Sequence, residues 1–309
     1  MSTQSNTMPG FFDSPRVEPI LSSTHPFMWS LRREVWEYRS IYLAPAAVAA
    51  VFLCGFLVTL GRLPAKLRAV EGIDPVRYRE IVAQPYDMIA GLMMLTGILV
   101  SVFYCVDALY GERRDRSILF WKSLPVSDLT AVLAKATVPL LVVPLVTFAT
   151  AIATQCIMLI VTSLVLLANG LSVGTLWVQL SFFQMTILLL YHLFTAHALW
   201  PAPVYCWLLL VSGWARRAVF LWAILPVLAI AGLERIVFHT SNFAMLVGTR
   251  FIGATHHAAV QPGDVFPTNP MTHITLARYL TSPGLWLGLL VAAAFIYAAA
   301  RLRRDRGPI

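Results

Sequence analysis

The sequence predicts an all-α integral membrane protein with about six transmembrane helices. Of its 309 residues, 58% are hydrophobic and only 12% are charged, whereas soluble domains carry roughly 25% charged residues. No Asp, Glu, Lys or Arg occurs in residues 136–215. Each such charge at a helix centre would cost about 2.5–3.5 kcal/mol on insertion into a bilayer. Several apolar runs also have the roughly 20 residues that a helix needs to cross a hydrocarbon core about 30 Å thick.

The N-terminal region divides into a polar tail, residues 1–25, and an amphipathic segment, residues 26–40. Apolar residues recur in the second segment at helical spacing, and they are Met28, Leu31, Val35 and Tyr38. The polar side carries Arg32, Arg33, Glu34, Glu37 and Arg39. Trp29 and Trp36 flank the apolar side, and indole rings beside arginines suit the headgroup layer. We therefore expect an interfacial helix, with a soluble helix that docks on another protein as the alternative.

The remaining chain, residues 41–309, is expected to form a single transmembrane domain. Its predicted spans are residues 41–61, 87–109, 132–167, 177–199, 218–237 and 284–300. Three loops rich in Lys and Arg fall on the same side, which the positive-inside rule assigns to the cytoplasm together with both termini. Their basic residues are Arg113, Arg114, Arg116, Lys122, Arg216, Arg217, Arg301, Arg303, Arg304 and Arg306. Five basic residues in the loop after the first span count against this orientation.

Two irregular features are expected in the long uncharged stretch. Pro139 and Pro144 should kink the third span near its cytoplasmic end, because proline removes a backbone donor and clashes with the preceding turn. Residues 201–217 form a short apolar piece, which we expect to be an interfacial or re-entrant element. Lys135 and Arg216 bracket the stretch on the cytoplasmic side, so the number of crossings between them is even.

The loop of residues 110–127 combines apolar bulk with charge. The candidate contact residues are Glu112, Arg113, Arg114, Arg116, Leu119, Phe120, Trp121 and Lys122. A short helix of this composition can seat in a groove of a partner protein. Ser127 can cap the third span and so join the loop rigidly to the membrane. The alternative is that the basic residues only set topology and bind anionic lipid, while Phe120 and Trp121 lie in the membrane interface.

The loop sequence YGERRDRSILFWKSLPVS resembles the type-2 ABC transporter permeases, including those of bacitracin and related antimicrobial-peptide exporters. In that family the matching stretch links the second and third spans and docks on an ATPase. The resemblance also extends to the amphipathic helix before the first span, the six spans and the segment 214–217. It implies a bacterial inner-membrane permease subunit of an exporter, paired with a second permease copy or paralogue and with two ABC ATPase subunits.

The resemblance also implies that ATP and magnesium bind to the partner ATPase. This chain has no Gly-rich phosphate loop of the Walker A pattern, so we expect it to bind no cofactor itself. We also assign it no catalytic or metal-binding residue. His192 and His197 lie five positions apart and are expected to be packing or cavity residues. The four cysteines fall within apolar segments, which favours buried thiols.

Two alternative functions stay open. A membrane enzyme acting on a lipid-linked substrate would have His256, His257 and Asp264 of the outer loop as its candidate site. An ABC-type complex could also serve envelope-stress sensing or resistance without net transport. The net charge of +8 does not favour nucleic-acid binding, because the basic residues form short clusters beside apolar runs and no continuous face.

Overall fold

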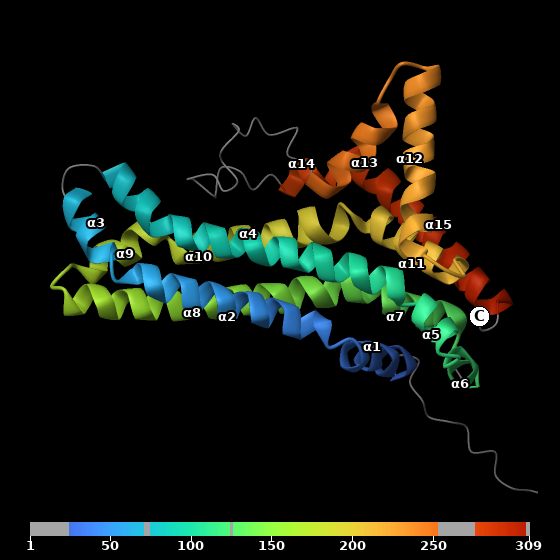
Figure 1. The fold of residues 1–309 in the computed structure, drawn as a ribbon, viewed down its shortest axis with the longest axis horizontal. Helices are drawn as coiled ribbons and strands as arrows, with labels where there is room; N and C mark the ends of the chain where they lie inside the picture. Colours follow the sequence, from blue (N-terminus) through green and yellow to red (C-terminus); the bar gives the residue numbers. More distant parts are fainter. Residues whose placement is uncertain (1–24, 71–74, 124–125, 253–275, 307–309) are drawn as a thin grey trace, which may run out of the picture.

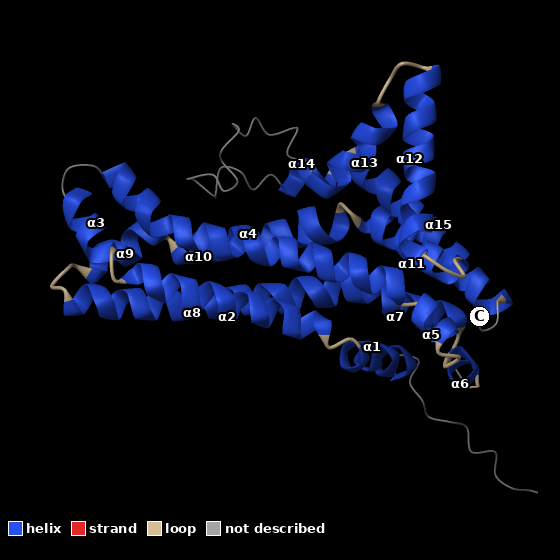
Figure 2. Ribbon diagram, viewed as in Figure 1, coloured by secondary structure: helices blue, strands red, loops and turns tan. Residues whose placement is uncertain are grey.

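The computed structural model describes residues 25–70, 75–123, 126–252 and 276–306, and all regular elements within them are helical (Figures 1 and 2). The first half contains α1 His25–Glu37, α2 Ser40–Leu60, α3 Leu63–Val70, α4 Pro75–Asp107, α5 Tyr110–Arg114, α6 Ile118–Lys122, α7 Asp128–Thr137, the π-helix η1 Val138–Val142 and α8 Val143–Ala168. The second half contains α9 Val173–Leu180, α10 Phe182–His192, the π-helix η2 Leu193–Leu199, α11 Ala202–Trp214, α12 Val219–Val237, α13 Asn242–Ile252, α14 Leu276–Leu280 and α15 Pro283–Asp305.

Six helical stretches in the described chain are long and apolar enough to cross a membrane, as predicted. They are Ser40–Leu60, Arg77–Arg114, Asp128–Ala168, Val173–Leu199, Val219–Val237 and Pro283–Asp305. The second and third stretches are longer than the predicted spans. At about 1.5 Å per residue, stretches of 38 and 41 residues exceed a hydrocarbon core of about 30 Å, so their ends project beyond it.

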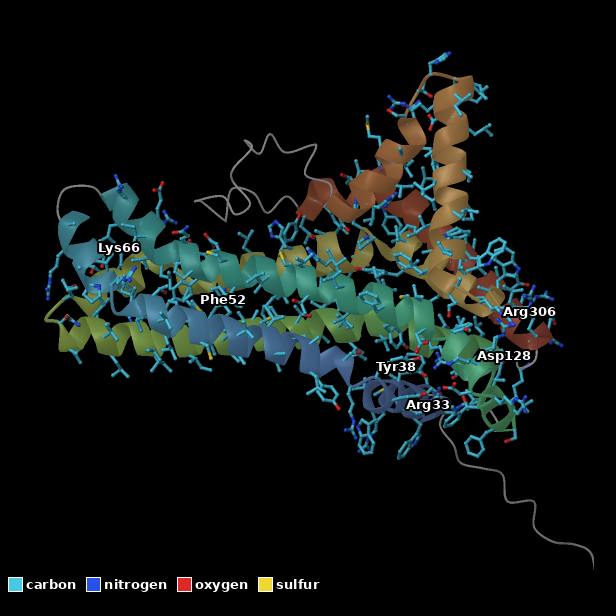
Figure 3. The ribbon with its side chains drawn as sticks, in the orientation of Figure 1. Arg33, Tyr38, Phe52, Lys66, Asp128 and Arg306 are labelled. Carbon is cyan, nitrogen blue, oxygen red and sulfur yellow. The ribbon has the colours of Figure 1, made fainter. Side chains whose placement is uncertain are left out.

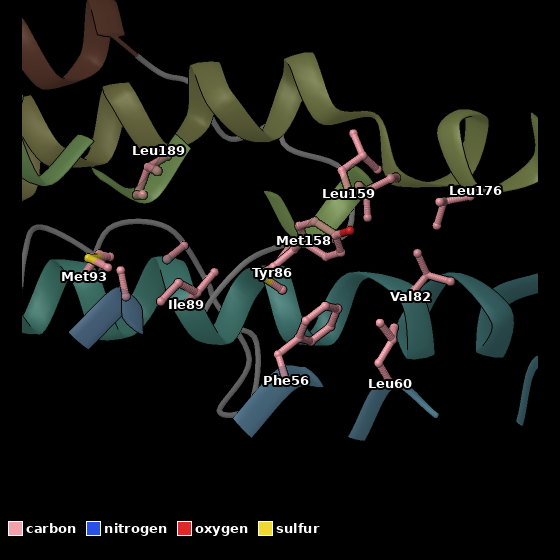
Figure 4. Close-up of a cluster of buried hydrophobic side chains, with 14 of the residues drawn as sticks. Phe56, Leu60, Val82, Tyr86, Ile89, Met93, Met158, Leu159, Leu176 and Leu189 are labelled. Atoms are coloured by element: carbon pink, nitrogen blue, oxygen red, sulfur yellow. The ribbon is translucent and has the colours of Figure 1, made fainter. Parts of the chain in front are cut away.

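The main apolar core lies among α2, α4, α8, α9 and α10. Figure 4 shows its centre, where Phe56 of α2, Tyr86 and Met93 of α4, Met158 of α8 and Leu189 of α10 come together. Polar side chains also join these helices: Gln155 Nε2 of α8 donates to the carbonyl of Tyr86 at 3.2 Å. Such bonds hold helices together where the surroundings offer no water.

The two π-helices pack against each other inside the bundle. The segment η1 contains Pro139, one of the two prolines predicted to kink this span; its backbone hydrogen bonds span five residues, and it continues into α8. On the other side, η2 leads into α11, which packs along α15 and α4. The piece expected to be interfacial or re-entrant is a 13-residue helix with Tyr205 and Leu209 among its buried residues, so it packs inside the protein.

Helix α12 departs from this arrangement. It rises away from the bundle across the long axis of the molecule, and α13 returns beside it (Figure 1). Apolar side chains are exposed around most of α12. Glu234, near its end, accepts hydrogen bonds at 2.8 Å from the backbone nitrogens of Asn242 and Phe243, and so caps the start of α13.

Both ends of the described chain meet at one end of the bundle. Helices α1, α5 and α6 and the last turns of α15 gather there (Figure 1). Figure 3 shows Arg33, Asp128 and Arg306 at this end, although they come from distant parts of the sequence. The loop singled out in the sequence is therefore surrounded by the first and last described helices.

Candidate functional site

The loop of residues 110–127 begins at a break between α4 and α5 that hydrogen bonds from α11 hold in place. The hydroxyl of Ser212 on α11 accepts hydrogen bonds at 2.9 Å from the backbone nitrogens of both Leu109 and Tyr110. Arg113 Nη1 donates to the carbonyls of Gly213 at 2.8 Å and Ala215 at 3.1 Å. Helix α5 is thus fixed to the end of α11 by bonds to backbone atoms.

Glu112 lies at the centre of a buried ion network. Its Oε1 lies 2.5 Å from Arg33 Nη2 of α1 and 3.2 Å from Lys135 Nζ of α7. Its Oε2 lies 3.6 Å from Arg303 Nη2 of α15. Only 4% of Glu112 is exposed, so this carboxylate is shared among three cations of the same chain. Glu112 therefore joins the loop to three other helices.

A second carboxylate, Glu34 of α1, completes the inner part of the network. Lys135 Nζ donates to both of its oxygens, at 2.9 and 3.0 Å, and the Tyr104 hydroxyl donates to Oε2 at 2.9 Å. Glu34 and Lys135 are 2% and 1% exposed. The pair is thus shielded from water as completely as the apolar core.

Arg303 extends the network to the start of α7. Its Nη1 lies 2.5 Å from Asp128 Oδ1, while its Nη2 faces Glu112. The network thus holds the cations Arg33, Lys135 and Arg303 and the carboxylates Glu34, Glu112 and Asp128, with the more exposed Glu37 at its edge, 3.3 Å from Arg33. Because buried charges are costly unless they are paired, these pairings offset the cost of burying the charged groups.

Burial and neighbouring carboxylates shift the pKa values of two side chains at the α1 side of the site. Burial alone would lower the pKa of the Arg33 guanidinium, but the carboxylates of Glu34, Glu112 and Glu37 outweigh it and the pKa is raised. Burial raises the pKa of the Tyr38 hydroxyl well above its ordinary range, and the Asp107 carboxylate raises it further. Tyr38 therefore stays protonated and donates to Asp107 at 3.2 Å.

The outer half of the loop presents the exposed face of α6. Leu119 and Phe120 are 58% and 60% exposed. Trp121 is half-buried, because the Arg33 guanidinium lies 3.7 Å from its ring centroid and Phe120 packs against its edge. Lys122 Nζ donates to the carbonyls of Arg304 and Arg306 at 3.1 and 3.2 Å. Helix α6 is thus held against α1 and the end of α15, and its exposed Leu119 and Phe120 form an apolar knob.

The eight predicted contact residues fall into two groups. Glu112 and Arg113 are buried and bonded within the chain. The others reach the surface at least in part, and they are Arg114, Arg116, Leu119, Phe120, Trp121 and Lys122. Arg114 pairs with the neighbouring Asp115 at 2.9 Å, and Arg116 adopts a left-handed backbone with φ of 59° at the bend between α5 and α6.

The predicted cap of the third span is confirmed. The Ser127 side chain accepts from the backbone nitrogen of Thr130 at 3.1 Å, and α7 begins at the next residue. Since α7 carries Lys135 two turns further on, the cap fixes the end of the loop next to the ion network.

Sequence reasoning missed the network, because it assigned its members to other roles. Glu34 was expected on the polar side of a surface helix, and Lys135 and Arg303 were interpreted as residues that set the membrane orientation. The available signal was their position: Lys135 directly precedes eighty residues without charge. An ionisable residue beside or within a span usually has a buried partner.

The histidine prediction is consistent with the structure. His192 Nδ1 lies 2.9 Å from the carbonyl of Leu188, and His197 Nδ1 lies 3.4 Å from the carbonyl of His192. Within the described ranges, no three His, Cys, Asp or Glu side chains are grouped as metal ligands. The candidate residues of the enzyme alternative, His256, His257 and Asp264, lie outside the described residues.

Comparison with known proteins finds no family model, no curated protein and no solved structure that matches this chain.

Proposed function

We propose that this chain is the permease subunit of an ABC-type exporter and that α6 is its ATPase-docking element. The observation that carries the proposal is the pairing of an exposed apolar knob, Leu119 and Phe120, with a buried ion network directly behind it. Six helices long and apolar enough to cross a membrane, together with the family resemblance of the loop, support it. In this scheme the bound ATPase supplies ATP hydrolysis and this chain supplies the pathway.

The network gives the docking element a mechanical connection to the membrane. A force applied to α6 reaches α5 directly, and Glu112 on α5 faces cations on α1, α7 and α15. Arg113 adds α11 through two backbone carbonyls. Paired buried charges resist separation, because removing one partner leaves the other uncompensated. Movement of the ATPase would therefore displace several helix ends together.

The two groups of loop residues receive different roles in this proposal. Leu119 and Phe120 contact the partner, since their side chains protrude from α6, and Arg114 and Arg116 lie beside them at the bend. Glu112 and Arg113 are positioning residues that hold the knob in place.

The test is copurification of an ABC ATPase with the tagged full chain from its native cells. We compare wild type with Leu119→Ser/Phe120→Ser and with the control Phe238→Ser. Phe238 is also exposed, at 70%, but lies at the far end of α12. We expect the ATPase to copurify with wild type and control and to be lost from the double variant, with all three inserted in the membrane.

Two results would contradict the proposal. Equal ATPase recovery with the double variant would exclude α6 as the docking element. Absence of any ATPase from wild type, under conditions that preserve other ABC complexes of the same cells, would exclude the permease assignment. Transport of a labelled substrate in reconstituted vesicles then separates an exporter from a resistance complex without net transport.

A further inference from the structure

A recess lies where α11 ends and α12 begins. It has a volume of about 680 Å³, within the range of roughly 300–1,000 Å³ typical of small-molecule sites. Its lining residues are Trp214, Ala215, Arg216, Arg217, Trp222 and Arg306. The two indole rings meet edge to face at 5.0 Å, and Arg306 Nη1 donates to the carbonyl of Trp214 at 2.8 Å. The end of α15 thus forms part of the wall.

The charge of this recess is unbalanced. Within the part of the chain that the structure describes, no ion pair involves Arg216, Arg217 or Arg306. In the adjacent ion network, by contrast, every cation faces at least one carboxylate. Three guanidinium groups around one hollow offer a site for an external anion, and guanidinium matches phosphate geometry well.

An apolar surface leads away from the recess along α12. Leu221 and Leu225 lie one turn apart and are 63% and 60% exposed. Trp214 and Trp222 stand at the junction, half-exposed, and indole rings favour the boundary between headgroups and hydrocarbon. The arrangement places an anion-binding pocket at the foot of an apolar helix, which matches an amphiphile with an anionic head.

We infer that this recess binds the phosphate of an anionic phospholipid, with the indole rings of Trp214 and Trp222 at the base of its acyl chains. The inference does not rest on the proposed permease function. An acidic segment of a partner protein would also complement the arginines, but the two indole rings in the wall and the exposed leucines beside the recess favour a lipid.

The test is lipid binding to the detergent-purified full chain, measured by native mass spectrometry during titration with phosphatidylglycerol or phosphatidylcholine. The recess variant is Arg216→Gln/Arg217→Gln. The matched control, Arg301→Gln/Arg304→Gln, removes the same charge from two exposed arginines of α15 that do not line the recess. We expect wild type and control to retain phosphatidylglycerol over phosphatidylcholine, and the recess variant to bind phosphatidylglycerol about tenfold more weakly or worse.

Gel filtration and thermal unfolding establish that both variants are folded. Equal weakening in the recess variant and the control would show that surface charge alone attracts the lipid, and would overturn the inference. Competition by inorganic phosphate at millimolar concentration would also overturn it, because the recess would then bind free phosphate. Loss of a protein partner from the recess variant with unchanged lipid binding would identify a protein interface and contradict the lipid site.

Discussion

The ammonium group of Lys135 lies 2.9 Å from the carboxylate of Glu34, although 101 positions separate them in the sequence. Both side chains are almost fully buried. The pair joins the helix before the first span to the start of the third. Each also has a second partner, Arg33 at 2.8 Å from Glu34 and Glu112 at 3.2 Å from Lys135, so the pair is one link in a larger network.

Lys135→Met is therefore expected to destabilise the protein strongly. It removes one of the two cations that Glu34 and Glu112 share, Arg33 being the other, and breaking a buried pair typically costs about 3–5 kcal/mol. The measurement is thermal or denaturant unfolding in a mild detergent. Adding Glu34→Gln to Lys135→Met should recover part of the loss, because it removes one of the uncompensated charges. A loss below about 0.5 kcal/mol in the single variant would show that the network does not support the fold.

The same substitution at two neighbouring arginines of α15 should change the free energy of unfolding by very different amounts. Arg303→Gln removes the partner of both Glu112 and Asp128 and should cost about 3 kcal/mol or more. Arg304→Gln changes an exposed side chain, so its effect should stay within about 0.5 kcal/mol. Unfolding of the two variants side by side checks the prediction. Similar stability of the two would place Arg303 outside the buried network.

Ser212→Ala is expected to loosen the junction between α4 and α5. The substitution leaves the backbone nitrogens of Leu109 and Tyr110 without their acceptor, and a buried donor left unpaired costs about 1–3 kcal/mol. Hydrogen exchange of a peptide covering residues 105–115 should become faster, whereas the same peptide in Ser123→Ala should exchange as in wild type. Unchanged exchange in Ser212→Ala would show that the junction is held by other contacts.

The membrane orientation can be tested with single cysteines in a variant whose four native cysteines are replaced. We expect Arg116→Cys, in the loop before α6, to react with an impermeant maleimide only from the cytoplasmic side. Asn242→Cys, at the start of α13, should react only from outside. Labelling of Arg116→Cys from outside would reverse the orientation derived from the basic loops and remove the docking proposal with it.

The helical class and the number of apolar spans were predictable from sequence, because hydrophobic length alone determines which segments can cross a bilayer. The Ser127 cap was also predictable, because it depends on neighbouring residues. The ion network was not, since Glu34, Glu112, Lys135 and Arg303 come from four distant segments and no local pattern links them. The burial of α11 could not be predicted for a related reason: its apolar residues do not reveal that α4 and α15 cover it.

The network also has an order of assembly. Arg303 is the last of its members to be synthesised, more than 160 residues after Lys135. Until α15 is in place, Asp128 lacks its Arg303 partner and Glu112 lacks one of its three cations. A chain without α15 would leave these two carboxylates short of positive charge, so the network is complete only once the last described helix has packed against α7.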